Sequence, residues 1–301
     1  MRKLVMLGNG FDLAHGLRTG YKDFLHEYVR GASFVGIKVD EDDFLKKILE
    51  NQSLRGWVDI EQEYYDELKK IVSSPSNSEQ GIKRLHKSFG QMQETLEAYL
   101  NGIQSGIGNC EKVFENLFDE ALEEHSHMLY NSSEHMILNF NYTSTLSIYE
   151  KQLKRYSRHK IIYIHGKIHD TRYPIIFGYG DETGEDYKKI ENLNNSEYLK
   201  YAKSTMYLRN QNYKNLVSFI DEDEFQVWVI GMSCGLTDRV MLKQVFEHKN
   251  CHSIRIFYHK NWDNYAYIAQ NISRHFDNKD IYRRKLVNYH DSKECPQWHP
   301  N

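Results

Sequence analysis

The sequence predicts an α/β fold, in which a mostly parallel sheet is flanked by helices and carries a large all-helical insertion. Two observations lead to this prediction. Short apolar runs recur along the chain without polar alternation, which is typical of strands covered on both faces, as in parallel sheets. A long polar stretch with helical spacing separates the first apolar run from all the others.

The strands are expected where these apolar runs lie. The first covers residues 3–7 and stops at a glycine turn, which marks the end of a buried strand. The later runs predict strands, in chain order, at residues 136–140, 161–164, 175–177, 226–230 and 254–258, with a final candidate at 285–289. The polar stretch therefore interrupts the sheet after its first strand.

The polar stretch itself is expected to be helical. Leu68 follows Tyr64 by four positions and Val72 follows Leu68 by four, which predicts a helix over residues 60–72. Further helices are expected at residues 43–49, 82–103 and 113–129, with a Ser- and Asn-rich loop at 73–78.

These elements divide the chain into two parts. We assign residues 1–40 and 131–301 to an α/β core, and residues 41–130 to the helical insertion. Residues 192–216, rich in asparagine and tyrosine, are expected to form an irregular surface helix, with a lid as the alternative.

The composition is that of a globular protein. The chain has 301 residues, of which 40% are hydrophobic and 13% aromatic, and disordered chains are poor in aromatics. The mean hydropathy of −0.71 therefore indicates a large polar helical surface. The net charge of −3 provides no general basic face, so a nucleic-acid partner is not expected.

The cysteines and the apolar runs indicate the cellular compartment in which the protein is expected. Cys110, Cys234, Cys251 and Cys295 show no C-x-x-C spacing, which fits free thiols in a reducing compartment. The first apolar run is too short for a signal peptide, and no run approaches the roughly 20 apolar residues of a membrane span. We therefore expect a cytoplasmic protein with no membrane partner.

The first chemical motif is Gly8-Asn9-Gly10-Phe11-Asp12, directly after the opening strand. A strand that turns through glycines into a helix exposes backbone N–H groups that bind phosphate well. A dinucleotide fingerprint needs a third glycine where Leu13 stands, so a dehydrogenase site is not expected. A turn without a ligand is the alternative.

Two further motifs follow predicted strands. Asn139, Asn141 and Thr143 stand at the carboxyl end of the second strand, where open α/β sheets hold ligands; helix capping by Thr143 is the alternative. His165, followed by glycine, ends the third strand and suits general base catalysis, with a structural histidine as the alternative. No metal is expected.

The fourth motif follows the strand at 226–230. Gly231-Met232-Ser233-Cys234-Gly235 matches the G-x-S-x-G pattern of serine hydrolases, with His252 or His259 available as the later histidine. Such a serine usually follows an early strand, and this strand comes late. In the insertion, Glu61 is a candidate to reach a cleft, although acids at this point also complement a helix dipole.

Taken together, five segments resemble the AbiH-type bacteriophage abortive-infection family, whose core is similar to sirtuins and other SIR2-like NAD-consuming proteins. The matching segments are KLVMLGNGFDLAHGL, ILNFNYTSTL, IIYIHGKIHD, IIFGYGDE and VWVIGMSCGLTDRVML. The resemblance implies a Rossmann-like, SIR2-like core that takes NAD⁺ as substrate or ligand, with no prosthetic group.

The same resemblance implies roles for individual residues. Asn141 would hold the ribose and the attacking water, and His165 would be the catalytic histidine. The nucleotide would be bound by Gly8, Asn9, Gly10, Phe11, Asp12, Asn139 and Thr143, and on its adenosine side by Gly231 and Ser233.

The departures from sirtuins narrow the expected activity. Thr143 replaces an aspartate, Phe11-Asp12 replaces a serine and an arginine, and no zinc ribbon is present, so a deacylase is not expected. We expect an NAD⁺ glycohydrolase of phage defence. It would respond to a phage trigger or partner protein and form homo-oligomers through the helical insertion. The alternatives are a non-catalytic nucleotide sensor and a serine hydrolase that uses Ser233.

Overall fold

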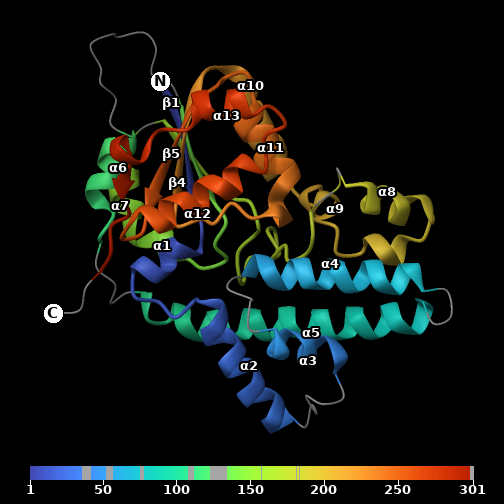
Figure 1. The fold of residues 1–301 in the computed structure, drawn as a ribbon. Helices are drawn as coiled ribbons and strands as arrows, with labels where there is room; N and C mark the ends of the chain where they lie inside the picture. The colour runs from blue at the N-terminus through green and yellow to red at the C-terminus, as the bar shows by residue number, and fades with distance from the viewer. Residues whose placement is uncertain are drawn as a thin grey trace.

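A six-stranded, fully parallel sheet of order β3-β2-β1-β4-β5-β6 forms the centre of the fold (Figure 1). Its strands are β1 Arg2–Leu7, β2 His135–Asn139, β3 His159–Tyr163, β4 Phe225–Ile230, β5 Cys251–Tyr258 and β6 Lys293–Glu294. The computed structural model describes residues 1–35, 42–51, 57–74, 78–107, 112–122, 134–156, 158–180, 182 and 184–298. The strand order is that of doubly wound nucleotide-binding folds, and it reverses direction between β1 and β4.

Helices cover both faces of this sheet, as the unbroken apolar runs predicted. Along β1, Leu4 and Met6 point into one core while Val5 and Leu7 point into the other, because successive strand side chains alternate between faces. The first core also contains residues of α10 Asn212–Glu222, α11 Arg239–Glu247 and α12 Trp262–Ser273. The second contains residues of α1 Asn9–Ala14, α6 Glu115–Leu122, η3 Thr145–Tyr149 and α7 Glu150–Leu153.

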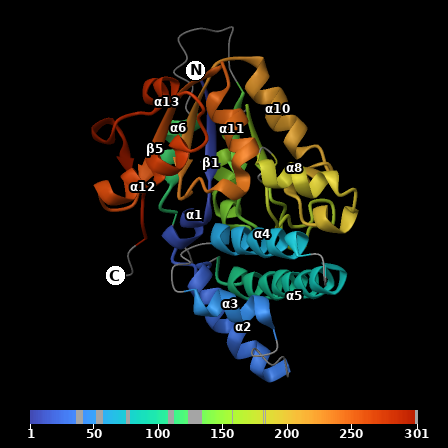
Figure 2. The same ribbon diagram turned by 45° about the vertical axis from the view of Figure 1, so that its right-hand side comes forward.

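Where it is described, the segment between β1 and β2 is largely helical, as predicted. Besides α1 and α6, its helices are α2 Tyr21–Val35, α3 Asp43–Glu50, α4 Trp57–Ser73 and α5 Ser78–Gln104. Helix α4 lies across the carboxyl edge of the sheet, and α5 runs beside it on the far side (Figures 1 and 2). Aromatic side chains hold this layer together, and the Tyr64 and Phe89 ring centroids lie 4.2 Å apart. The layer therefore covers the sheet edge at which ligands bind in such folds.

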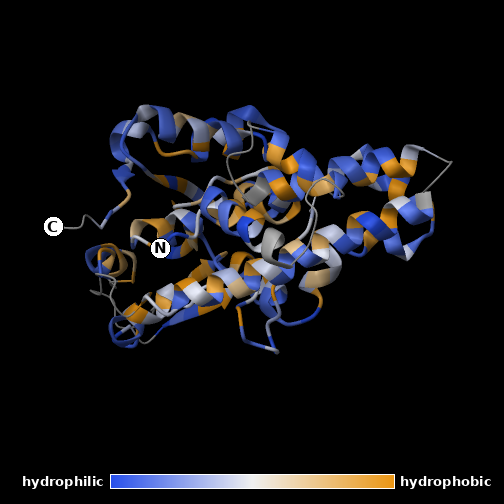
Figure 3. Ribbon diagram, turned by 90° about the horizontal axis from the view of Figure 1, so that it is seen from below, coloured by the Kyte–Doolittle hydropathy of each residue, from blue (hydrophilic) through white to orange (hydrophobic). Residues whose placement is uncertain are grey.

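The remaining elements are short. They are α8 Glu185–Asn192, η4 Ser196–Leu199, α9 Lys203–Tyr207, η5 Leu236–Asp238, α13 Lys279–Lys285 and η6 Tyr289–Asp291. Seen from below, the helices carry hydrophilic and hydrophobic stretches in alternation (Figure 3). In the part of the chain that the structure describes, no helix combines the length and apolarity needed to cross a membrane. Cys234, Cys251 and Cys295 are buried free thiols, and Cys110 lies outside the described residues.

Three predicted elements need correction. Residues 175–177 form no strand: Phe177 stacks on Phe89 of α5, so their apolarity reflects burial against the helical layer. Residues 285–289 contain the end of α13 and an isolated bridge from Leu286 to Ile254, and the last strand is β6. Residues 192–216 are not a surface helix, because they contain η4, α9 and the start of α10.

Two predictions extend beyond the described residues. The helix expected at 113–129 is α6 where it is described, and residues 123–129 lie outside the described part. The predicted loop at 73–78 begins at the last residue of α4 and ends at the first residue of α5. Its residues 75–77 lie outside the described part of the chain.

The division into core and insertion stays a prediction, and packing crosses it in several places. Helix α2 packs against α5, α6 packs against β1, and α4 packs against α8 and η5. One hydrophobic core also runs without interruption from Leu4 and Met6 of the sheet to Phe44 and Tyr64 of the insertion.

Candidate active site at the carboxyl edge of the sheet

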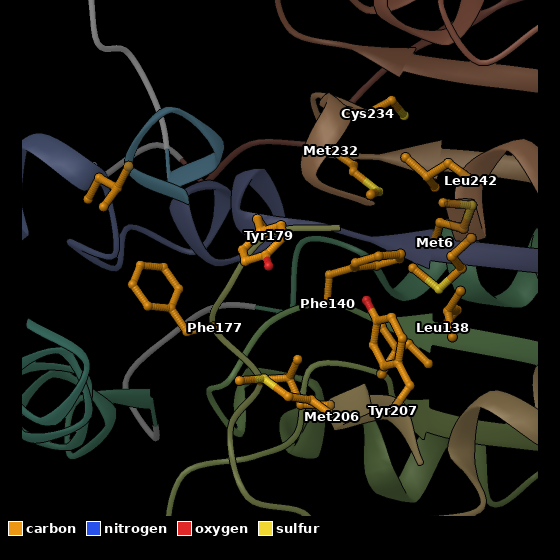
Figure 4. Close-up of a cluster of buried hydrophobic side chains, with 14 of the residues drawn as sticks. Met6, Leu138, Phe140, Phe177, Tyr179, Met206, Tyr207, Met232, Cys234 and Leu242 are labelled. Carbon is orange, nitrogen blue, oxygen red and sulfur yellow. The ribbon is translucent and has the colours of Figure 1, made fainter. Parts of the chain in front are cut away.

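A cavity of about 240 Å³ lies at the carboxyl ends of the strands, against α4. Eight of the eleven residues proposed for the site line it: Gly8, Asn9, Asp12, Asn141, Thr143, His165, Gly231 and Ser233. Residues absent from that set also line it, among them Glu61, Tyr142 and Asp238. Its apolar wall includes Phe140, Phe177 and Met232, which come from three separate segments of the chain (Figure 4).

The three other proposed residues lie elsewhere. Phe11 is fully buried in the core on the other face of the sheet, 4.8 Å from Phe114 between ring centroids. Asn139 is buried and does not line the cavity, and its Oδ1 accepts a hydrogen bond from the Asn141 backbone, at 3.0 Å. Gly10 lines a second cavity. Phe11 is therefore a core residue, and Asn139 supports the backbone of the cavity residue Asn141.

The glycines of the first loop serve a backbone contact with the loop after β4. A Cβ on Gly10 would lie 2.5 Å from the Gly231 Cα, and one on Gly8 would lie 2.7 Å from the Gly231 carbonyl oxygen. Gly231 itself has a φ of 60°, which favours glycine. These glycines are therefore required for two loops to touch, whether or not a ligand binds.

The expectation of bare N–H groups in this loop is wrong for three of its residues. Gly8 N–H donates to the Ile230 carbonyl, Gly10 N–H to the Gly231 carbonyl and Phe11 N–H to the Gly8 carbonyl, at 3.0, 2.7 and 2.9 Å. Within the described residues, the backbone N–H groups of Asn9, Met232 and Ser233 make no hydrogen bond. The donors left for a ligand therefore come from both loops.

Asn141 is fixed by the first loop. Its Nδ2 donates to the Gly8 carbonyl oxygen at 3.0 Å, although the two residues are 133 positions apart. Within the described residues, its Oδ1 has no partner, and the side chain lines the cavity. The carboxamide is thus held in one orientation, with an acceptor left for a ligand or a water molecule.

Asp12 is a fully buried carboxylate beside Asn141. Its Oδ2 accepts a hydrogen bond from Thr143 Oγ1 at 2.7 Å, and Thr143 Oγ1 lies 3.0 Å from Thr145 Oγ1. Its Oδ1 is buried and has no hydrogen-bond partner among the described residues. Burial raises the pKa of Asp12 to about 6, against the opposing effect of the two threonine hydroxyls. Thr143 is therefore tied to a carboxylate that another element supplies.

His165 forms a buried pair with Asp238. Its Nε2 lies 2.9 Å from Asp238 Oδ1 and 3.2 Å from the Tyr207 hydroxyl, which donates to the same carboxylate oxygen at 3.2 Å. A charge-assisted bond to Asp238 favours the tautomer with its proton on Nε2. The other ring nitrogen, Nδ1, has no partner among the described residues, so it is the one free to accept a proton.

Behind this pair lies a fully buried lysine. Lys203 Nζ is 3.1 Å from Asp238 Oδ1 and 2.9 Å from Glu61 Oε2. The other Glu61 oxygen, Oε1, accepts the Gly178 backbone N–H at 3.1 Å. Glu61, Lys203, Asp238 and His165 thus form a continuous buried network that joins α4 of the helical layer to the end of β3.

The network perturbs the pKa of each acid differently. Burial alone would raise the pKa of Asp238, but the Lys203 ammonium and the His165 imidazole outweigh it and hold that pKa well below its usual range. Burial raises the pKa of Glu61, against the opposing charge of Lys203. Burial would lower the pKa of Lys203, and the two carboxylates instead raise it. Asp238 and Lys203 are therefore held in their charged forms.

The loop with the serine-hydrolase motif lacks two features of a nucleophile elbow. The strained positive φ values of this loop fall on Gly231 and Cys234, at 60° and 54°, and not on Ser233. Within the described residues, the Ser233 hydroxyl bonds to no histidine. His275 instead binds the Cys234 carbonyl oxygen, at 2.9 Å from its Nε2.

A second cavity, of about 370 Å³, lies on the other side of the two touching loops. Gly231, Met232 and Ser233 line both cavities. The second is also lined by β5 and α12, through Phe257, Tyr267 and Ile268. The two cavities thus flank the point between β1 and β4 at which the strand order reverses.

The sequence indicated part of this site and missed the rest. Glu61 was a candidate to reach a cleft, and it does line the cavity. No sequence pattern marked Asp238 or Tyr207 as site residues of their own. Lys203 is buried, although it lies in the stretch that was expected on the surface. Among the described residues, no group of three or more His, Cys, Asp or Glu side chains is arranged to hold a metal ion.

Comparison with known proteins gives one result. The sequence model of the family described as "Bacteriophage abortive infection AbiH" matches residues 4–260. The matched range begins in β1 and ends after β5, and it includes every residue of the cavity described above. No curated protein matches the chain significantly.

Proposed function

This chain belongs to the bacteriophage abortive infection family AbiH, and we propose that it acts in that role by binding NAD⁺ and hydrolysing the bond between nicotinamide and ribose. One arrangement supports this proposal above the others. Asn141 and the His165–Asp238 pair face one acidic cavity at the edge where open α/β sheets bind nucleotides.

The charge of the cavity suits the reacting end of NAD⁺. Asp12, Glu61 and Asp238 line it, and among the described lining residues none is Lys or Arg, while Lys203 behind the wall offsets one of the acidic charges. Nicotinamide in NAD⁺ is a cationic leaving group, and its departure gives an oxocarbenium-like transition state. Fixed carboxylates stabilise such positive charge more strongly in a buried site than in water.

In the proposed reaction His165 acts as the base and Asn141 orients the reacting groups. Nδ1 of His165 takes a proton from a water molecule whose oxygen forms the new bond to the ribose C1′. The bond from C1′ to the nicotinamide nitrogen breaks, and neutral nicotinamide leaves with the electron pair. Asn141 Oδ1 orients the water or a ribose hydroxyl, because Gly8 fixes its carboxamide. Asp238 holds the imidazole in the required tautomer.

The rest of the dinucleotide would extend over the loop after β4. The free N–H groups of Asn9, Met232 and Ser233 are the donors for the diphosphate. The adenosine half would enter the second cavity, between β5 and α12. This assignment keeps Gly231 and Ser233 as contacts and gives Gly8 and Gly10 a supporting role.

Nicotinamide release from NAD⁺ tests the proposal, with binding measured in parallel by calorimetry. His165→Ala and Asn141→Ala are expected to abolish release while NAD⁺ still binds. In bacteria that express the chain, phage infection is expected to lower NAD⁺ with the wild type and not with His165→Ala. A protein that binds no NAD⁺ would overturn the proposal, and binding without release in infected cells would favour a nucleotide sensor.

A further inference from the structure

Lys203 is a buried cation that the proposed reaction does not use. It comes from α9, its side chain is 1% exposed, and its ammonium contacts two carboxylates. An ammonium taken out of water is stabilised only where opposite charge and hydrogen bonds replace the water. The chain therefore maintains a costly arrangement directly behind the candidate base.

We propose that Lys203 is a positioning residue, which neutralises the charge of Asp238 and thereby keeps His165 in the neutral form that accepts a proton. The argument starts from a shared atom, because Asp238 Oδ1 contacts both Lys203 Nζ and His165 Nε2. When an aspartate has no charged partner other than a histidine, its negative charge stabilises the protonated imidazolium form of that histidine. An imidazolium cannot accept a further proton, so it cannot act as a base. With Lys203 in place, the carboxylate already has its counter-charge.

Glu61 makes this charge balance depend on the helical layer. It is the second acid on Lys203, and Gly178 N–H holds its other oxygen. If Glu61 is ionised, the network of two acids and one lysine keeps a negative charge that again favours imidazolium. Burial raises the pKa of Glu61, against the opposing charge of Lys203, so burial disfavours the ionisation that would restore this negative charge.

The other titratable groups around the network do not supply this charge. Burial raises the pKa of Tyr142 and Tyr207 well above the usual value and also raises that of Cys234, which favours their neutral forms. Burial lowers the pKa of His275 and raises that of Glu182, which shares a small cavity with Lys203. Lys203 thus contacts Asp238 as a cation, on the same oxygen as His165.

The test reads the charge of one imidazole in the full chain without NAD⁺. The ring ¹⁵N and ¹³C resonances of His165 are assigned by their loss in His165→Gln. In Lys203→Met, the ratio of imidazolium to imidazole at pH 7 is expected to rise about tenfold or more. Lys203→Arg, which restores the cation, is expected to bring the ratio back towards that of the wild type. Lys188→Met removes an exposed lysine paired with Glu185 and is expected to leave the ratio unchanged.

A second variant covers the case in which Lys203→Met does not fold. Glu61→Gln combined with Lys203→Met removes one acid together with the cation, and the same rise is expected because Asp238 remains. An unchanged ratio in a folded Lys203 variant would overturn the inference. The role of His165 as base rests on the proposed function, whereas its charge is measured without substrate. A shifted ratio in a protein that binds no NAD⁺ would therefore retain this inference and remove only the NAD⁺ proposal.

Discussion

His165 Nε2 and Asp238 Oδ1 lie 2.9 Å apart, although 73 positions separate the two residues in the chain. One follows β3 near the edge of the sheet and the other ends η5 beyond the central strand β4. The pair is therefore made by the fold and spans its centre.

Replacing Asp238 by asparagine should slow nicotinamide release while leaving NAD⁺ binding largely intact. The amide keeps the shape of the side chain but no longer selects the Nε2–H tautomer or stabilises the imidazolium that forms during the reaction. A loss of ~10²- to 10⁴-fold in kcat is expected. Tyr207→Phe, which removes a neutral donor to the same oxygen, should cost less than about tenfold. Equal losses in the two variants would contradict the role given to the carboxylate charge.

Gly10→Ala should destabilise the protein, because its new Cβ would lie 2.5 Å from the Gly231 backbone and neither loop can move freely. A loss of about 1–3 kcal/mol in unfolding free energy is expected, as for other overpacked sites. Gly102→Ala is the control, since Gly102 lies within α5 and no atom would meet its Cβ within 4 Å. That variant should gain up to about 1 kcal/mol through helix propensity. Urea unfolding of both measures the contrast, and a neutral Gly10→Ala would mean that the loops do not touch in solution.

Asp12→Asn should stabilise the protein at neutral pH but not in acid. Burial raises the folded-state pKa of Asp12 to about 6, above its value of about 4 in the unfolded chain. Because the folded protein holds this proton more tightly, the contribution of Asp12 to stability falls as pH rises from about 4 to about 6. Above that window the penalty is complete, on the order of 3 kcal/mol.

The measurement for Asp12 is urea unfolding of wild type and Asp12→Asn at several pH values. The difference between their unfolding free energies should be small at pH 4 and should grow in favour of the variant towards pH 7. Taking the difference cancels the titration of other groups, including Asp238, whose lowered pKa acts in the opposite sense. A difference that does not vary with pH would mean that Asp12 is not buried as an acid.

Ile268→Trp should distinguish the two halves of the proposed ligand. Ile268 of α12 lines the second cavity, and a larger ring would fill the space assigned to adenosine. The Kd for NAD⁺ should rise about tenfold or more, equivalent to about 1.4 kcal/mol. Binding of nicotinamide mononucleotide, which lacks the adenosine half, should not change. Ile281→Trp, on the partly exposed surface of α13, serves as the control. If both ligands weakened alike, the second cavity would not be the adenosine site.

The sequence predicted correctly those parts of the fold in which an apolar run is buried because it is a strand of the sheet. Val5 and Leu7 lie in an unbroken apolar run because both faces of β1 are covered, and the same holds for β2 and β4. Residues 175–177 have the same pattern for another reason, since they pack against α5 and not in the sheet. Apolarity reports burial, and it does not identify the partner that causes the burial.

The same limit applies to the site. Asn141 and His165 could be predicted to meet, because they end neighbouring strands of a parallel sheet and line one cavity. Lys203 could not, because its burial depends on where α9 packs, and nothing in a polar stretch marks one lysine as buried. The glycine at position 10 was visible, but sequence alone does not separate a close backbone contact from a phosphate site.

The position of β1 has a consequence for synthesis of the protein on the ribosome. This strand lies between β2 and β4, yet both partners follow it in the chain, and Asn141 is 133 residues away from the Gly8 carbonyl that it binds. At translation rates of about 5–20 residues per second, β1 waits on the order of ten seconds for its first neighbour and longer for its second. A nascent chain therefore has no assembled cavity until β4 and Asp238 have emerged, so the proposed activity would be withheld from every unfinished copy.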